Sequence, residues 1–312
     1  MEKNAITENK PYRSLNVYYR ELFGRKAAKI SLDGGFTCPN RDGTCGTGGC
    51  LFCSAGGSGD FAEHASLSIT EQIASGKSQT SDKWKDAAYI AYFQAFTNTY
   101  APVAELRQKY EEALSCDGIE GLSVATRADC LPEDVLDLLG ELNQKTKLWV
   151  ELGLQTANEK TAHFIRRGYD NGVFETAVSE LSKRGIPVIV HVILGLPEET
   201  REDMLATICY LNQLPIQGIK LQLLHVLSDS DLAQLYLSGG YTPLTKEEYI
   251  SLIGECIAYL REDIVIHRLT GDGDKNTLLA PLWSLRKRDV LNSIHKYLKE
   301  KNIRQGSKIV ES

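Results

Sequence analysis

The sequence predicts an α/β fold built on a parallel sheet, and three observations lead to this class. Six apolar runs recur along residues 29–226, and helical patterns lie between them. Strands that alternate with helices form parallel sheets through right-handed crossovers. The runs at 121–126 and 186–195 are almost continuously apolar, which is typical of strands that are covered on both faces.

The expected elements follow in a regular order. The apolar runs predict strands at 29–33, 87–93, 121–126, 148–155, 186–195 and 219–226. Helical periodicity predicts helices at 133–144, 173–185 and 201–214. The first of these begins favourably, because Pro132 suits a first turn and Glu133 and Asp134 lie near the positive end of the helix dipole.

Two arrangements of these strands are possible, a complete or partial barrel and a doubly wound open sheet, and their spacing suits either. After residue 227 the pattern changes to helices with one short apolar run at 264–269. We therefore predict a basic N-terminal segment at 1–28, a sheet unit at 29–227, and a C-terminal extension at 228–312 that packs on it.

Composition and charge narrow the function. We expect a cytoplasmic protein with no membrane partner, because no apolar run reaches the length of a membrane span and no signal peptide is visible. The formal net charge is -6, yet residues 10–29 carry six bases and one acid, and residues 284–308 carry eight bases and two acids. Basic ends on an acidic body indicate either a nucleic-acid surface or ordinary solvated helix faces.

The strongest chemical signal is the loop at 34–60, which holds Cys38, Cys45, Cys50 and Cys53. It follows the first strand, and the carboxyl end of the sheet is where α/β folds place their active sites. Thiols crowded on a loop in a reducing compartment indicate metal or redox chemistry. Zinc would use all four cysteines, whereas an iron–sulfur cluster would use three and leave one iron open. The spacing alone does not decide between them.

Longer motifs surround this loop. Residues 31–53 read SLDGGFTCPNRDGTCGTGGCLFC, and AYFQAFTNTYAP, VELGLQTANEKT, HVILGLPEET and TGDGD follow. These strings, spread over nearly the whole chain, closely resemble the bacterial YtqA/YhcC-like family of radical S-adenosylmethionine (SAM) enzymes, which is related to the catalytic subunit of Elongator. The first cysteine gap has eleven residues, whereas the commonest spacing in the superfamily is C-x3-C-x2-C.

The resemblance implies a partial (β/α)6 barrel of the TIM type with a helical C-terminal extension. It also implies one [4Fe–4S] cluster on Cys38, Cys50 and Cys53, with Cys45 as a bystander. SAM would bind the open iron, and its reductive cleavage would give a 5′-deoxyadenosyl radical that abstracts hydrogen from the substrate. An electron donor such as flavodoxin or ferredoxin is a further implied partner.

The remaining SAM contacts are expected at the carboxyl ends of successive strands. After the second strand, Gln94, Thr97 and Asn98 stand where much of the superfamily has a GGE-like turn. After the third strand come Thr126 and Arg127, and the guanidinium of Arg127 suits a carboxylate.

The fourth and fifth strands complete this expected set. Glu151 and Gln155 lie an even number of residues apart, so we expect both side chains on one face. Glu151 is an acid in an apolar strand and needs a partner, which is either a SAM ribose hydroxyl or a structural ion pair inside the barrel. Gly195 and Pro197 shape the turn that lines the adenine in this superfamily.

Substrate contacts are expected from Lys220 and Gln222, which share one face of the sixth strand, and from Asp272 in the TGDG turn. His225 falls on the other face of that strand by the same count. We interpret His191 and His225 as structural residues, because no partner for either can be identified from the sequence.

The expected substrate is transfer RNA, at the C5 side chain of a wobble uridine. The Elongator catalytic subunit modifies this position, and the basic ends could hold RNA phosphates. Tyr12, Tyr18 and Tyr19 lie among the N-terminal bases, where a splayed base could stack. Two alternatives stay open: a radical SAM enzyme that acts on a small metabolite or a peptide, and a zinc-stabilised RNA-binding adaptor with four cysteine ligands.

Overall fold

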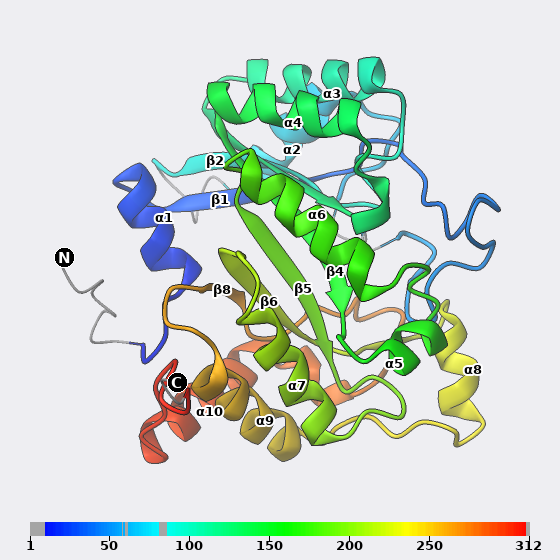
Figure 1. Ribbon diagram of the computed structural model, residues 1–312, viewed down its shortest axis with the longest axis vertical. Helices are drawn as coiled ribbons and strands as arrows, with labels where there is room; N and C mark the ends of the chain where they lie inside the picture. The colour runs from blue at the N-terminus through cyan, green and yellow to red at the C-terminus, as the bar shows by residue number, and fades with distance from the viewer. Residues whose placement is uncertain (1–9, 58, 60–61, 81–85, 310–312) are drawn as a thin grey trace.

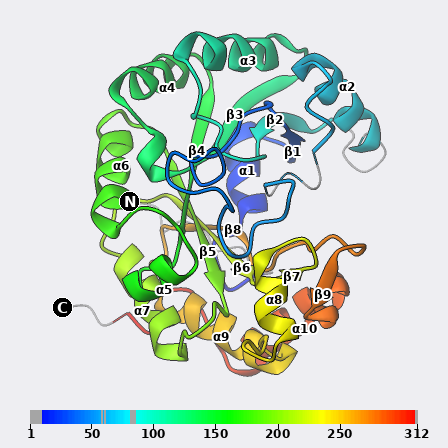
Figure 2. The ribbon, with the colours of Figure 1, turned by 90° about the vertical axis from the view of Figure 1, so that its right-hand side faces the viewer.

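The computed structural model describes residues 10–57, 59, 62–80 and 86–309. Residues 1–9 of the expected N-terminal segment and residues 58 and 60 of the expected cluster loop lie outside the described residues. Within the described ranges the chain forms a curled half-barrel, in which a parallel sheet is covered by helices on its outer side (Figure 1 and Figure 2). The predicted partial α/β barrel is confirmed.

The half-barrel contains seven parallel strands, one more than expected. The seventh comes from the apolar run at 264–269, which we expected in the C-terminal extension and which instead pairs with the sixth strand of the sheet. The strands lie side by side in chain order: β1 (Ala27–Leu32), β2 (Ala88–Phe93), β3 (Ile119–Thr126), β4 (Lys147–Gln155), β5 (Val188–Leu194), β6 (Gly218–Leu223) and β8 (Val265–Arg268). The sheet therefore continues beyond residue 227.

The helices form the outer layer of the half-barrel and the C-terminal part of the chain (Figure 1). Their bounds are α1 (Leu15–Phe23), α2 (Ile69–Thr80), α3 (Val103–Ser115), α4 (Glu133–Lys145), α5 (Glu159–Phe164), α6 (Asn171–Lys183), α7 (Arg201–Leu211), α8 (Asp231–Leu237), α9 (Lys246–Tyr259) and α10 (Lys287–Glu300). Two 3-10 helices, η1 (Ala128–Cys130) and η2 (Leu282–Leu285), and a small antiparallel pair, β7 (Val226–Leu227) with β9 (Leu278–Ala280), complete the fold. None of the helices in the described ranges combines the length and the apolar character that crossing a membrane requires.

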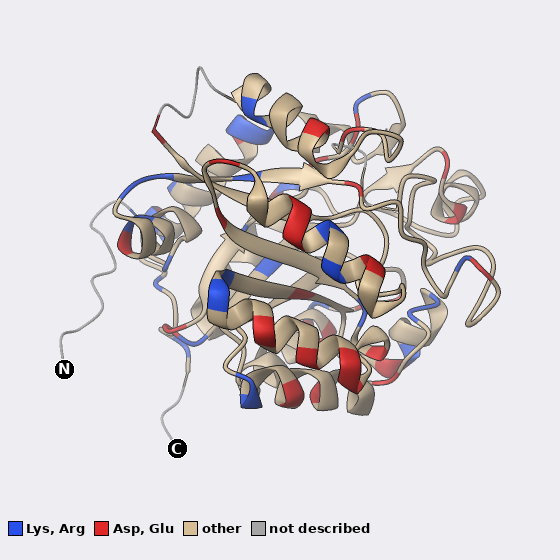
Figure 3. Cartoon of the chain, turned by 90° about the horizontal axis from the view of Figure 1, so that it is seen from above, with Lys and Arg blue, Asp and Glu red and all other residues tan. Residues whose placement is uncertain are grey.

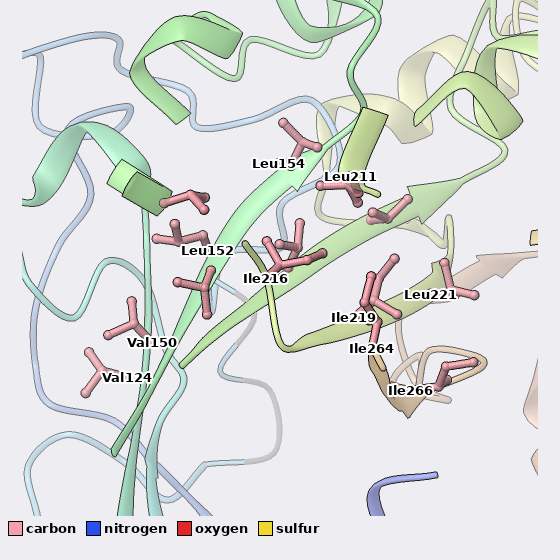
Figure 4. Packing of buried hydrophobic residues seen from close by; sticks show 14 of the residues in the cluster. Val124, Val150, Leu152, Leu154, Leu211, Ile216, Ile219, Leu221, Ile264 and Ile266 are labelled. Carbon is pink, nitrogen blue, oxygen red and sulfur yellow. The ribbon is translucent and has the colours of Figure 1, made fainter. Parts of the chain in front are cut away.

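The main core lies between the sheet and the outer helices. On β4, the side chains of Val150, Leu152 and Leu154 are fully buried and belong to the same cluster as Leu211 of α7 (Figure 4). Successive side chains of a strand point to opposite faces. The inner face of β4 therefore carries Trp149 and Glu151, and the outer core leaves this inner face available for polar groups.

Helix α1 closes the amino end of the half-barrel. Tyr19 of this helix packs edge-on against Trp149, with ring centroids 5.8 Å apart, and both belong to a cluster with Ile90 and Ile189. In this cluster, Ile90, Trp149 and Ile189 lie within the first three residues of β2, β4 and β5. The N-terminal segment is thus a plug at the end opposite to the strand carboxyl ends.

Two of the three N-terminal tyrosines that we expected to stack on a base are buried. Tyr12 and Tyr19 are only 5% and 3% exposed, and the hydroxyl of Tyr12 bonds to His295, so neither ring is available for a splayed base. Lys29 points into the half-barrel and is paired there with Glu151. On the helices, basic residues are interspersed with acidic ones (Figure 3). The stacking prediction is wrong for Tyr12 and Tyr19, because aromatic residues between bases also fit an amphipathic helix that packs on a barrel. For Tyr18, which is half-buried, it stays a prediction.

Candidate functional site

A cavity that is open to solvent lies at the carboxyl ends of the strands. Ligand sites of α/β folds are expected at this end of the sheet. Cys38, Cys50 and Cys53 all line the cavity, as the resemblance implies. Cys45 does not; it lines a separate pocket, which Cys130 also lines.

Three of the four loop cysteines line one cavity, and Cys45 lines another. Among the residues that the structure describes, no three Cys, His, Asp or Glu side chains lie close enough together to hold one metal ion. A closed zinc site needs four ligands around one ion, whereas a [4Fe–4S] cluster can use three cysteines and keep one iron open. The four cysteines of the zinc alternative are therefore not gathered around one point, and the three that share a cavity are those that the resemblance implies for a cluster.

The surroundings of Cys50 favour a thiolate. Cys53 donates a hydrogen bond to Cys50, which lowers the pKa of Cys50 to about 7 and raises that of Cys53 well above its usual value. The side-chain amide of Asn40 also donates to the Cys50 sulfur, at 3.4 Å, and to the Arg166 carbonyl, at 2.7 Å. Asn40 thus ties the cysteine loop to the segment that follows α5.

Glycine is required at position 168 of that segment. Its φ is +86°, and a Cβ there would lie 2.8 Å from Asn40 Oδ1 and 3.0 Å from Arg127 Nη2. A side chain would displace both neighbours, so the IRRGYD motif, residues 165–170, is explained by close packing behind the cysteine loop.

The predicted cofactor-binding residues divide into two groups. Six of them line the cavity, namely Gln94, Thr97, Thr126, Arg127, Glu151 and Gln155. Asn98, Gly195 and Pro197 are not among the lining residues. Asn98 is fully buried and its amide donates to the Ala125 carbonyl at 2.9 Å. The Gly195 carbonyl instead accepts from the Tyr241 hydroxyl at 2.7 Å, so this turn faces the C-terminal part of the chain and not the cavity.

Arg127 already has a carboxylate partner in the protein. Its Nε and Nη2 donate to Asp129 at 2.9 and 2.6 Å, and its Nη1 donates to the Arg167 carbonyl at 2.9 Å. The expected two-point pairing of Arg127 with a ligand is therefore made within the chain. The guanidinium contributes positive charge to the cavity wall beside Cys50.

Glu151 and Gln155 both line the cavity, as their even spacing along the strand predicts. The strand is irregular between them, because the pairing of β4 with β5 shifts between Gly153 and Gln155, and Gln155 has a φ of +62°. A bulge changes the direction of nearby side chains, so even spacing alone does not account for the direction of Gln155.

The floor of the cavity is a buried polar layer centred on Glu151, whose side chain is 0% exposed. One carboxylate oxygen accepts from Lys29 and from Ser123 (2.7 Å), and the other accepts from Lys220 and from His191 (2.6 Å). Lys220 also donates to the Tyr92 hydroxyl at 3.0 Å. We call these six residues, each from a different strand of β1–β6, the Glu151 network: Lys29, Tyr92, Ser123, Glu151, His191 and Lys220.

Burial and the charges of this network shift the pKa values of its members. Burial alone would raise the pKa of Glu151, but the ammonium groups of Lys220 and Lys29 hold it well below its usual range. Burial lowers the pKa of Lys220 to about 7 and that of His191 to about 4. We expected Glu151 to meet either a SAM ribose hydroxyl or a structural ion pair. The structure contains the ion pair, and both carboxylate oxygens already accept hydrogen bonds within the chain.

The network also gives His191 the partner that the sequence did not reveal. Sequence reasoning missed Lys29, Tyr92 and Ser123 as well, although one signal was available: Lys29 and Ser31 alternate with apolar residues in the first strand. Such alternation indicates that the inner face of a strand meets polar groups.

The cavity continues into a second lobe towards the C-terminal part of the chain. Gln222 lines both lobes, and His225 and Asp272 line only the second. Asp272 accepts from Lys287 at 2.5 and 2.6 Å and lies 3.5 Å from Arg268. His225 reaches the same lobe as Gln222 because β6 ends at Leu223 and strand alternation no longer applies.

Glu199, in the turn after β5, allows a prediction about pH. Burial raises its pKa to about 7, while the Thr156 hydroxyl donates to it. Between about pH 4.5 and 7 the folded state keeps a proton that the unfolded state has lost, so stability falls as the pH rises. Glu199→Gln is therefore expected to raise the free energy of unfolding at pH 8 by about 1–3 kcal/mol, and the gain should shrink as the pH falls toward 4.5.

Urea unfolding at several pH values measures this effect. The exposed neighbour Glu198, paired with Lys160, provides the control, since Glu198→Gln should change stability by less than about 0.5 kcal/mol at any pH. A Glu199→Gln variant that is no more stable than the parent protein at pH 8 would show that the buried carboxyl is not strained.

Comparison with known proteins agrees with this geometry. Residues 42–211 match the family model described as "Radical SAM superfamily", and residues 216–300 match "Radical_SAM C-terminal domain". The uncharacterized protein YtqA of Bacillus subtilis is 47% identical over 297 residues, which cover 95% of this chain and 92% of YtqA. The tRNA uridine(34) acetyltransferase of Methanocaldococcus jannaschii is 24% identical over 189 residues, 59% of this chain and 33% of that protein.

Among solved structures, the archaeal Elp3 of Methanocaldococcus infernus has the same fold, with a TM-score of 0.67 at 15% identity over 89% of this chain and 64% of that one. Members of the matched superfamily use a [4Fe–4S] cluster and SAM. The three cysteines on one cavity, the half-barrel and the two family matches lead to one conclusion: the chain belongs to the radical SAM superfamily and, within it, to the YtqA-like family that its motifs indicate.

Proposed function

We propose that this radical SAM enzyme modifies the C5 side chain of the wobble uridine in tRNA. One observation carries the proposal. A stretch that makes up 59% of this chain is similar to a protein whose name places its activity at uridine 34 of tRNA, the wobble position. The shared stretch covers only a third of that protein, so we infer a common substrate position and not a common reaction.

The geometry supports a reaction between two ligands. Cys38, Cys50 and Cys53 on the first lobe would hold the cluster, which supplies a strong one-electron reductant and, with SAM, a radical able to take hydrogen from carbon. The Glu151 network closes the floor beneath them with groups that are already paired, and this keeps water from the reacting atoms. The second lobe leaves room for a substrate beside the first.

The electron must come from outside the chain, since the family needs a donor. We propose a small redox protein such as flavodoxin or ferredoxin. This part of the proposal is tested by asking whether either protein, reduced, replaces dithionite in SAM cleavage by the purified enzyme.

Mass spectrometry of tRNA nucleosides tests the substrate. A deletion strain is expected to lose one wobble-uridine derivative and to accumulate its precursor, and a plasmid copy of the parent gene should restore the product while a Cys50→Ala copy should not. Labelled tRNA should bind the purified protein at low salt. Normal levels of every wobble-uridine derivative in the deletion strain would show that the enzyme acts on something else.

A further inference from the structure

We propose that the second lobe of the cavity receives the uracil base itself, and that Gln222 and His225 read its hydrogen-bonding edge. The inference rests on the proposed function, because it assigns residues to the substrate named there. Enzymes that act on a base take it out of the stack into a pocket that offers apolar walls and a few polar groups for the base edge.

The polar groups of the second lobe include two without partners. Among the described residues, the Nε2 of His225 is buried and has no hydrogen-bond partner. The half-buried amide of Gln222, which lines the same lobe, forms no hydrogen bond with the described residues either. Buried polar atoms normally have partners. An amide and a neutral imidazole each offer both a donor and an acceptor, so the pair can match the alternating carbonyl and N–H groups of uracil.

The position of His225 is fixed by the TGDG turn, residues 270–273. A Cβ at Gly271 would lie 2.9 Å from His225 Cε1, and one at Gly273 would lie 3.4 Å from its Cγ. A side chain at Gly271 would push the ring away, and Gly273 lies in contact with it. The turn is therefore built around the imidazole, which burial keeps neutral by lowering its pKa to about 4.

The charged residues at this lobe are paired with one another. Asp272, which we expected to meet the substrate, accepts from Lys287 and lies 3.5 Å from Arg268. The rest of the wall is mixed, with polar side chains (Ser54, Gln94, Gln155 and His191) beside apolar ones (Phe52, Ile193, Leu223, Leu224 and Leu227). A flat, neutral heterocycle with polar edges suits such a wall, because aromatic and aliphatic side chains can stack on its faces while polar groups meet its edges.

The two lobes also give the base a direction. His225 lines only the second lobe, whereas Gln222, Phe52 and His191 line both. A uracil whose Watson–Crick edge meets His225 turns its C5 carbon away from this residue and toward the lobe of the cysteines. Hydrogen abstraction requires the reacting atoms to approach closely, and this orientation brings the C5 side chain to the place where the radical would form.

The test uses the full-length protein, reconstituted anaerobically and saturated with SAM. Binding is measured for a synthetic anticodon stem-loop with uridine at the wobble position and for the same RNA with cytidine there. The parent protein should prefer uridine by at least about tenfold, since one mismatched edge leaves buried polar groups unpaired. Gln222→Leu and His225→Phe should bring this ratio close to one with little change in the binding of the cytidine RNA.

Gln234 on α8 is exposed, so Gln234→Leu is the matched control and should keep the parent ratio. Cluster absorbance and SAM binding at parent levels show that each variant is folded. If the parent protein discriminates and both variants still do, or if it binds both RNAs equally, the assignment of the second lobe is wrong while the proposed function stands. If it binds neither RNA yet cleaves SAM, the proposed function itself fails.

Discussion

Replacing Cys50 by alanine is expected to abolish both the cluster and the cleavage of SAM, and Cys38→Ala and Cys53→Ala should do the same. The three thiols line one cavity at the strand carboxyl ends, and a [4Fe–4S] cluster with only two protein ligands is not held. Cys45→Ala should keep both properties, because Cys45 lines a different pocket. It is a matched control, since it removes the same atoms from the same loop.

Protein purified without oxygen measures this directly. The parent protein and Cys45→Ala should be brown, with about four irons and four sulfides per chain, and should release 5′-deoxyadenosine when SAM and a reductant are added. The other three variants should be colourless and should release none. A colourless parent protein that binds one zinc, or a Cys45→Ala variant that loses its metal, would contradict the cluster assignment.

The main features of the fold could be predicted because they depend on local patterns. The apolar runs that became β3 and β5 are almost continuous in the sequence, and strands covered on both faces need such runs. The helix at Glu133–Lys145 was predicted from its apolar period and its acidic first turn. The position of the cysteine loop could be predicted because the loops that follow the strands of a parallel sheet gather at its carboxyl end.

What could not be predicted depends on contacts between distant segments. β8 is only four residues long, and the same apolar run would suit an extension packed outside the sheet. Tyr19 lies between basic residues, and only its contact with Trp149 shows that it belongs to the core. The turn at Gly195 faces Tyr241 because the C-terminal part of the chain folds back over it, and no pattern near Gly195 reports this.

At the candidate site, the partners of Glu151 could not be predicted from the sequence either. A buried acid demands a partner, but the sequence does not reveal which. The partners come from strands that are up to 122 residues away in the chain, and their meeting depends on how tightly the sheet curls. A sequence pattern can therefore indicate that Glu151 is important without indicating whether a ligand or the protein satisfies it.

Neutralising Glu151 is expected to be among the most destabilising single changes in the chain. Glu151→Gln keeps the shape of the side chain but leaves Lys29 and Lys220 facing a neutral amide in a buried layer. Breaking a buried pair in this way costs about 3–5 kcal/mol, because a charge stays buried without compensation. Since the pKa of Glu151 is depressed, its contribution is present above the ordinary carboxyl pKa and is lost as the pH falls through the folded-state value.

Urea unfolding of the reconstituted protein at pH 7 tests this prediction, with Glu255→Gln as the control. Glu255 pairs with Arg201 at 2.7 Å, but both side chains are about a third exposed, so its loss should cost less than about 1 kcal/mol. The double variant Glu151→Gln with Lys220→Met should lose less free energy of unfolding than the sum of the losses of the two single variants. The reason is that Lys220→Met removes a charge that Glu151→Gln leaves unpaired. Additive costs would contradict the pairing.

SAM affinity separates this structural role from the cofactor contact expected for Glu151. If the carboxylate serves only its protein partners, Glu151→Gln should bind SAM as the parent protein does whenever it is folded, since both of its oxygens already accept hydrogen bonds within the chain. A folded Glu151→Gln protein with a normal cluster and much weaker SAM binding would instead mean that a ligand hydroxyl competes for this carboxylate. The network would then have to rearrange on binding, because four donors from the protein already surround the same two oxygens.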